Sequence, residues 1–272
     1  MLNPTTLEEM TSLIDWIREF VDSTGAKGVV LGASGGADSS CVMGLLTRAI
    51  GADRALAVTM GIESSDHALT DAHLAAQWCG VRIIDRSLER TFATFLEEAQ
   101  LDGDEAFEAL SAKRKAILRG NVKARLRTTM VRCWAEANGY LFVNTCNWSE
   151  TIVGYDTKGG GDADGDFSPL MQFVKGCVWS MLRMMNAPQQ IIDKAPSADL
   201  EEGQTDEDDL QMSYAVLDAF AAAFAAGGRQ AVLEMDDPEG KRGRFLHLMD
   251  GSRHKRAPMP TFQREGFVHD GT

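Results

Sequence analysis

The sequence predicts an α/β fold in which a doubly wound parallel sheet carries helices on both faces, a three-layer sandwich. Apolar runs of strand length alternate with helical periodicity over the first 85 residues. The runs are almost continuously apolar, which is typical of strands buried on both faces. A glycine-rich turn follows the first run directly, and ligands of such sheets bind at the carboxyl ends of the strands.

The first third of the chain predicts three strands, each followed or preceded by a helix. Leu7, Met10, Leu13, Ile17 and Val21 recur at helical spacing after two threonines, and the glutamates at 8 and 9 suit a capping box. We expect strands at 28–31, 55–60 and 81–85, a helix that follows the glycine-rich turn and ends at about residue 50, and a helix at about 66–79. Helices between parallel strands imply right-handed crossovers.

Hydrophobic periodicity and the positions of glycine and proline predict the elements after residue 85. We expect helices at 88–99 and at 105–138 with an interruption at Gly120, a strand at 140–145, and a loop at 155–166 that is rich in Gly and Asp. Helical periodicity resumes from about 169 to 186, and Pro188 opens a short further helix. The polar, acidic stretch 194–209 is predicted to be a mobile surface loop. An alanine-rich helix at about 214–226, another helical stretch and a basic tail at 253–256 follow it.

The composition of the chain argues against several classes of protein. With 272 residues, 44% of them hydrophobic, the chain is expected to form one domain over 1–272. The formal charge of −13 argues against nucleic-acid partners. We find no apolar run of bilayer length and no secretion signal, so we expect no membrane contact and a cytoplasmic location. Five scattered cysteines without a C-x-x-C pair predict reduced thiols and no zinc site.

The turn from Gly32 to Ser40 (GASGGADSS) is the strongest candidate for a binding site. Glycine allows a ligand to approach the backbone, and the first N–H groups of the following helix have no partner within the helix. The helix dipole adds to the attraction for an anion such as phosphate. The turn is not a Walker A loop, because no Gly-Lys-Ser/Thr closes it, and its glycines do not fit G-x-G-x-x-G.

Residues 34–40 (SGGADSS) resemble the pyrophosphate loop of the ATP pyrophosphatase superfamily, which has the adenine nucleotide alpha hydrolase-like fold. Further motifs follow in order: 119–125 (RGNVKAR), 144–150 (NTCNWSE), 153–158 (VGYDTK), 168–170 (SPL) with Lys175, 194–207 (KAPSADLEEGQTDE) and 254–256 (HKR). Together they are similar to the ammonia-dependent NAD synthetases over nearly the whole length. The resemblance implies that ATP activates the carboxylate of deamido-NAD as an adenylate, and that ammonia then displaces AMP.

The resemblance also assigns residues. Asp38 and Lys175 would be catalytic, and Asp38 and Glu150 would bind Mg²⁺, which fits a hard cation that keeps several waters. ATP would contact the turn and three other side chains: Gly32, Ala33, Ser34, Gly35, Gly36, Ala37, Asp38, Ser39, Ser40, Thr145, Lys175 and Ser197. Deamido-NAD would be held by Arg125, Lys158, Asp166, His254 and Lys255.

Taken without the motifs, several of these residues fit simpler roles. Glu150 also fits a solvated acid at a helix start, and Lys175 a solvated helix face. Arg125 also fits a helix salt bridge, and residues 254–255 a frayed basic end.

The sequence departs from the family pattern near the nucleotide site. One extra residue precedes Asp166, so Asp162 or Asp164 could share its role. The segment 60–66 (MGIESSD) lacks an arginine that relatives often carry and has Glu63 instead. Ala37 and Asn144 replace a common Gln and Gly. Two alternatives therefore stay open: a paralogue that adenylates another carboxylate, and an inactive nucleotide-binding homologue.

The nitrogen source and the assembly are further expectations. The resemblance fills the chain and leaves no room for a glutaminase domain, so we expect free ammonia, or ammonia from a separate partner chain. The resemblance implies a homodimer, and the helical segment 105–138 is apolar enough to pack against a partner.

Overall fold

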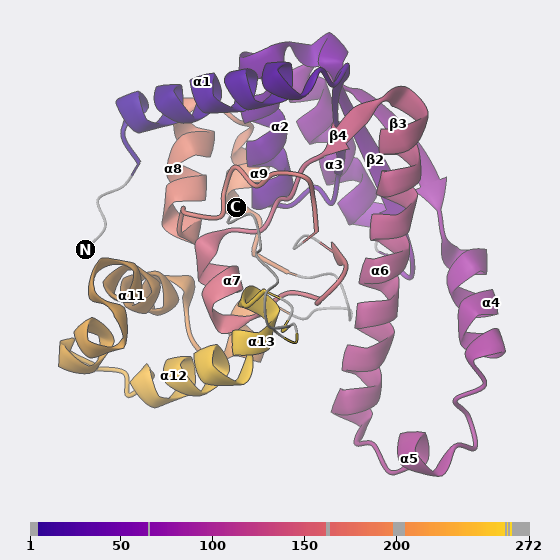
Figure 1. The fold of residues 1–272 in the computed structure, drawn as a ribbon, viewed down its shortest axis with the longest axis vertical. Coiled ribbons are helices and arrows are strands. Elements are labelled where there is room, and N and C mark those ends of the chain that lie inside the picture. The colour runs from indigo at the N-terminus through magenta and orange to yellow at the C-terminus, as the bar shows by residue number, and fades with distance from the viewer. Residues whose placement is uncertain are drawn as a thin grey trace.

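Four parallel strands form the centre of the molecule in the order β3-β2-β1-β4 (Figure 1). The computed structural model describes residues 5–64, 66–161, 164–197, 205–258, 260 and 262. The strands are β1 (Gly28–Gly32), β2 (Ala55–Gly61), β3 (Arg82–Ser87) and β4 (Tyr140–Phe142). The chain runs outward from β1 to β3 and returns to the other side of β1 for β4. The strand order therefore reverses between β1 and β4, and a crevice for a ligand is expected at their carboxyl ends.

Helices cover both faces of the sheet, as predicted. Val29 and Leu31 belong to the core cluster that also contains residues of α1 (Leu7–Thr24) and α2 (Ala37–Ile50). Val30 points to the opposite face, where it clusters with Val131 and Ala135 of α6 (Ala112–Asn138). Successive strand residues point to opposite faces, so one apolar strand supplies both cores.

Twelve further elements complete the described chain. They are η1 (Ala52–Arg54), α3 (Asp66–Cys79), α4 (Glu89–Ala99), α5 (Glu105–Glu108), α6 (Ala112–Asn138), α7 (Trp148–Val153), α8 (Lys175–Met184), α9 (Gln189–Asp193), α10 (Asp206–Leu210), α11 (Tyr214–Glu234) and the pair α12 (Arg242–Gly251) and α13 (Arg253–Arg256). A second core joins α7, α8, α10, α11 and α12. In Figure 1, α11 and α12 lie together at the lower left, away from the sheet.

The capping box predicted for the first helix is confirmed. Thr6 is the N-cap of α1, and its Oγ1 accepts a hydrogen bond from Glu9 N at 3.1 Å. The Glu9 carboxylate accepts in return from Thr6 N at 3.2 Å. Two N–H groups at the helix start are thus satisfied by local side chains.

Helix boundaries were predicted less well where distant groups set them. The interruption placed at Gly120 is wrong: this glycine is buried inside α6, and the break lies at 109–111, where Ser111 caps α6. The helix expected from 169 begins at Lys175, because Ser149 and Asp218, from other helices, bind its first N–H groups.

Two other boundaries also differ. The strand expected at 140–145 ends at Phe142, after which Val143 pairs with Phe167 as an isolated parallel bridge. The stretch read as a mobile loop contains α10, which Thr205 caps and which buries Asp206. Residues 198–204 of that stretch lie outside the described residues.

Helix α11 has a kink at Gly227 and Gly228, directly after the predicted end of the alanine-rich helix, and the further helical stretch continues to Glu234. By length and composition it is the one helix in the described chain that could cross a membrane, although the sequence reading found no run of that length. It buries Tyr214, Leu217 and Phe220 in the second core.

Candidate active site

The turn after β1 has the backbone expected of an anion site. Gly36 is the N-cap of α2, and no side chain caps the first N–H groups of that helix. Gly35 has φ +71°, and a Cβ atom built there would lie 2.6 Å from the N atom of Ala72 in α3. Only glycine fits this position, for both reasons. The turn therefore presents N–H groups at the carboxyl end of β1.

The serines of the turn differ in their surroundings. The hydroxyls of Ser34 and Ser39 lie 3.1 Å apart, and Gly36 N donates to Ser34 Oγ at 3.2 Å. Ser40 is fully buried, and its hydroxyl has no hydrogen-bond partner within the described parts of the chain. Ser34 and Ser39 are thus the hydroxyls at the loop, whereas Ser40 faces the interior.

Lys175 joins the turn to the segment after β4. Its Nζ atom lies 2.5 Å from Oδ2 of Asp38 and 3.1 Å from Oε1 of Glu150. The Lys175 side chain is only 3% exposed. The simpler reading of Lys175 as a solvated helix face is therefore wrong, because the ammonium is buried between two carboxylates.

The segment 144–150 holds Asp38 and Glu150 in place. Asn147 caps α7, with its Oδ1 accepting from Glu150 N at 3.1 Å, and its Nδ2 donates to Asp38 Oδ1 at 2.8 Å. Glu150 is buried, so it is not a solvated acid at a helix start. Thr145 is also buried, at the carboxyl side of β4, next to this cluster in the chain.

Helix α11 adds two residues that the sequence reading did not single out. The Tyr214 hydroxyl lies 3.0 Å from Glu150 Oε1 and 2.9 Å from Asp206 Oδ2. Asp218 accepts from Ser149 Oγ at 2.5 Å and from Gly176 N at 2.7 Å. Tyr214 and Asp218 are four positions apart, so they share one face of the helix. This spacing is visible in the sequence and is the signal by which the pair could have been found.

Burial and neighbouring charges shift the pKa values of Glu150 and Lys175. Burial raises the pKa of Glu150 to about 7; Lys175 opposes this rise, and Asp38 and Asp206 add to it. Burial alone would lower the pKa of Lys175, but Asp38 and Glu150 outweigh it and raise that pKa above its ordinary value. Lys175 therefore stays charged, while Glu150 holds its proton more tightly than an ordinary carboxyl.

The donor set fits Mg²⁺. Two carboxylates, Asp38 and Glu150, already converge on one cation, the ammonium of Lys175. Within the described ranges no three His, Cys, Asp or Glu side chains gather into a larger metal cluster. A site with two protein carboxylates suits Mg²⁺, which keeps waters and takes phosphate oxygens as its other ligands.

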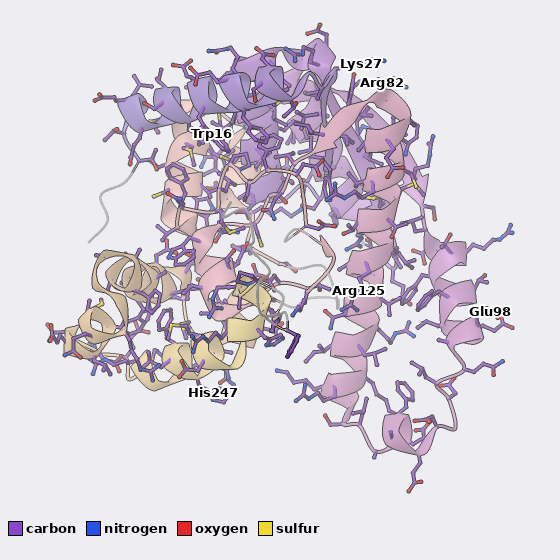
Figure 2. All side chains as sticks on the ribbon, viewed as in Figure 1. Trp16, Lys27, Arg82, Glu98, Arg125 and His247 are labelled. Carbon is purple, nitrogen blue, oxygen red and sulfur yellow. The ribbon has the colours of Figure 1, made fainter. Side chains whose placement is uncertain are left out.

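Four of the five residues expected to hold a dinucleotide lie in segments that contact one another. Arg125 Nη2 donates to the Lys158 carbonyl at 3.1 Å, and Lys158 Nζ donates to the His254 carbonyl at 3.0 Å. Lys255 Nζ donates to the carbonyls of Gly154 and Asp156. Figure 2 shows Arg125 on the side of α6 toward α13. The 254–255 pair lies in a helix, so the reading as a frayed end is wrong.

Asp166 lies apart from these four. Its carboxylate binds the Arg132 guanidinium and accepts from Phe142 N at 2.8 Å. Asp164 binds the same guanidinium at 2.9 Å, so both acids tie the 155–166 loop to α6 and the edge of β4. Asp162 lies outside the described residues. Ser197, expected at ATP, is exposed.

Comparison with known proteins identifies the family. A family model described as NAD synthase matches residues 9–259. The chain belongs to the NAD synthase family. The resemblance read from its motifs is therefore confirmed, and so is the predicted fold class.

Several relatives of the NAD synthase family match over most of their length. The NH(3)-dependent NAD(+) synthetase of Mesoplasma florum is 36% identical over 249 residues, 92% of this chain and 93% of that protein. The same enzyme of Pyrococcus furiosus is 38% identical over 74% of this chain and 73% of its own. The solved NMN synthetase of Francisella tularensis has a TM-score of 0.81 at 25% identity, over 96% of this chain and 100% of that chain.

One departure from the family pattern has a structural counterpart. Glu63, in the loop after β2, has φ +49°, and its carboxylate binds Arg119 and Lys123, each at 2.8 Å. Arg127 Nε donates to the Met60 carbonyl, near the end of β2, at 3.1 Å. The cations around this loop therefore come from one face of α6 instead of from the loop itself.

Proposed function

We propose that the protein forms NAD from deamido-NAD, ATP and ammonia, with AMP and pyrophosphate as the other products. The observation that carries the proposal is the joining of the pyrophosphate-type turn to Glu150 and the 144–150 segment through Lys175. Membership of the NAD synthase family and the names of its ammonia-dependent relatives support the same reaction.

The first step activates the acid. A carboxylate oxygen of deamido-NAD attacks the α-phosphorus of ATP, an acyl adenylate forms, and pyrophosphate leaves. Negative charge grows on the phosphates in this step, where N–H donors and cations stabilise it most. The N–H groups at the start of α2, the hydroxyls of Ser34 and Ser39, and the Lys175 ammonium would provide this stabilisation.

The second step forms the amide. Ammonia attacks the carbonyl carbon of the adenylate, and AMP leaves with the bridging oxygen. Mg²⁺, held by Asp38 and Glu150, would supply positive charge to the phosphates. Because the ammonium of Lys175 lies between these carboxylates in the structure, we propose that it moves onto phosphate when the nucleotide binds.

The remaining ATP and dinucleotide residues keep their proposed roles. Thr145 and Ser197 would contact ATP. Arg125, Lys158, His254 and Lys255 would form the deamido-NAD site, since three elements bring them together. For Asp166 we propose a supporting role, because its carboxylate already serves Arg132 and Phe142.

The product assay tests the reaction. Purified protein with deamido-NAD, ATP, Mg²⁺ and ammonium should release AMP and NAD in equal amounts. Folded protein that releases neither would refute the proposal. An inactive nucleotide-binding homologue would instead bind ATP without turnover.

A second function is favoured by one observation, the match to a solved NMN synthetase over the whole of that chain. On the same site, the acid would then be nicotinic acid mononucleotide, activated by the same adenylation. Direct competition between the two acids, followed by identification of the amide, distinguishes the two functions.

We further propose a single domain that takes free ammonia, or ammonia from a separate partner chain, in the cytoplasm, without nucleic-acid or membrane partners. The coverage of the ammonia-dependent relatives supports the nitrogen source. We also propose a homodimer through α6, which exposes Ile117 and lines a cavity of about 440 Å³ that reaches Arg125. Sedimentation tests the dimer.

A further inference from the structure

A cation with no role assigned so far lies against the pyrophosphate loop. The Nζ atom of Lys194 is 3.3 Å from the carbonyl oxygen of Gly35 and 2.7 Å from Oδ2 of Asp71. We propose that Lys194 is a further phosphate-binding residue, which contacts the pyrophosphate as it leaves ATP. This inference rests on the proposed cleavage of ATP at the α-phosphorus.

Asp71 fixes the position of this ammonium. It lies on α3 and is buried, and its second oxygen accepts from Gln190 Nε2 of α9 at 2.6 Å. A Cβ atom on Gly35 would lie 2.6 Å from the Cβ of Asp71. Asp71 therefore supports the loop and Lys194 at the same point, and it places the ammonium beside the loop.

Lys194 retains the capacity to bind an anion. An ammonium group has three N–H donors, and the two contacts of Nζ that the structure shows, to Asp71 and Gly35, leave one. The Lys194 side chain is 29% exposed, whereas that of Asp71 is 10% exposed. The Asp71 carboxylate is thus largely buried, whereas part of the Lys194 side chain remains accessible to solvent.

The charge of the site calls for such a cation. Residues 32–40 contain Asp38 and no Lys or Arg. Lys175 is shared by two carboxylates, Asp38 and Glu150, so these three side chains together carry a net negative charge when all are ionised. Pyrophosphate adds several negative charges, which fixed cations must offset for the site to hold it.

The chain beyond Lys194 leads toward the other end of the proposed ATP site. The Pro196 carbonyl accepts from Asp206 N at 3.1 Å. Asp206 in turn binds the Tyr214 hydroxyl, which also contacts Glu150. The segment 194–197 therefore connects the loop with the carboxylates proposed to bind Mg²⁺. In the proposed site, the phosphates of ATP lie between the loop and these carboxylates.

The alternative is that Lys194 only clamps the loop through Asp71 and the Gly35 carbonyl. Two variants separate these roles, because Lys194→Met and Asp71→Asn both break the ion pair but only the first removes the ammonium. If Lys194 binds phosphate, only Lys194→Met should lose affinity for pyrophosphate. If Lys194 is only a clamp, both variants should lose affinity equally.

The experiment is calorimetric titration of the variants with magnesium pyrophosphate. Lys194→Met should weaken binding about tenfold or more, the size expected for a charge-assisted hydrogen bond. Asp71→Asn should bind as tightly as wild type or more tightly. Lys27→Met is the matched control and should not change binding, since exposed Lys27 precedes β1 at the opposite end of the sheet (Figure 2).

Two results would overturn the inference: binding by Lys194→Met within twofold of wild type, or equal losses in Lys194→Met and Asp71→Asn. Thermal melts establish that each variant is folded. If Lys194→Met does not fold, Lys194→Gln and Lys194→Arg replace it, and Arg alone should retain binding. Absence of AMP and NAD from wild type refutes the reaction, whereas unchanged pyrophosphate affinity with normal turnover refutes the role of Lys194 alone.

Discussion

Lys175 Nζ lies 2.5 Å from Asp38 Oδ2, although 137 positions separate the two residues in the chain. The contact joins the turn after β1 to the first residue of α8, across the point where the strand order reverses. Both partners are held by other groups: Asp38 by Asn147, and the α8 start by Ser149 and Asp218. Other residues thus hold Asp38 and the start of α8 close together at the site.

Replacing Lys175 with Met should reduce both stability and turnover. It leaves Asp38 and Glu150 buried side by side without a cation, which costs roughly 3–5 kcal/mol for a broken buried pair. Turnover should fall by about a hundredfold or more. Thermal melts should show a larger stabilisation by Mg²⁺ in this variant than in wild type, because the ion replaces the missing charge. A variant as stable and active as wild type would contradict the role of Lys175.

The raised pKa of Glu150 predicts the pH dependence of stability in metal-free protein. Its pKa is about 7 when folded and near the ordinary value of 4.5 when unfolded, so the folded state binds more protons between these values. The free energy of unfolding should therefore fall as the pH rises from 5 to 7, by up to about 1.4 kcal/mol per unit. Urea denaturation in the presence of a chelator measures this, and Glu150→Gln should flatten the slope. An unchanged slope in Glu150→Gln would assign it to other groups.

Gly35→Ala should impair ATP binding and destabilise the fold. The left-handed backbone costs alanine about 1–2 kcal/mol, and the new Cβ would meet Ala72 N at 2.6 Å. Gly243→Ala is the matched control: it lies in α12 with open space around it, and a small gain in stability is expected. Melting temperatures and ATP titrations compare the two. Normal ATP affinity in Gly35→Ala would mean that the loop does not hold the phosphates.

Asp218→Ala should lower turnover, although Asp218 is not proposed to contact the substrate. It removes the acceptor for Ser149 Oγ and Gly176 N, which together fix the start of α8 and the position of Lys175. We expect a loss of about 1–3 kcal/mol in stability and a lower kcat, with the KM for deamido-NAD nearly unchanged. Asp218→Asn keeps one acceptor and should recover part of kcat. Equal kcat in Ala, Asn and wild type would exclude a positioning role.

Local patterns predicted much of the fold. The alternation of apolar runs and helical periodicity places the first three strands and α1 to α4 close to their observed positions, because neighbouring residues set these elements. The predicted helix boundaries were wrong where residues distant in the sequence determine them. The start of α8 depends on Asp218, and the burial of Asp206 depends on Tyr214, which no local pattern reveals.

In the candidate site, too, local motifs identified some residues, and contacts between distant segments revealed the others. Motifs identified Asp38, Glu150 and Lys175, which the structure brings together. The motifs did not include Tyr214 or Asp218 and assigned no role to Lys194 within 194–207, because the place of these residues at the site depends on contacts between distant segments. Asp166 was aligned by motif across an extra residue, and the structure ties it to Arg132.

Adenylation of the acid is the central claim, and the fate of a carboxylate oxygen tests it most directly. Deamido-NAD labelled with ¹⁸O in the nicotinate carboxyl group is incubated with the protein, ATP, Mg²⁺ and ammonium, and the AMP is analysed by mass spectrometry. If the carboxylate attacks the α-phosphorus, each AMP formed carries one ¹⁸O atom, and one NAD appears with it. Unlabelled AMP, or ADP in place of AMP, would contradict the mechanism.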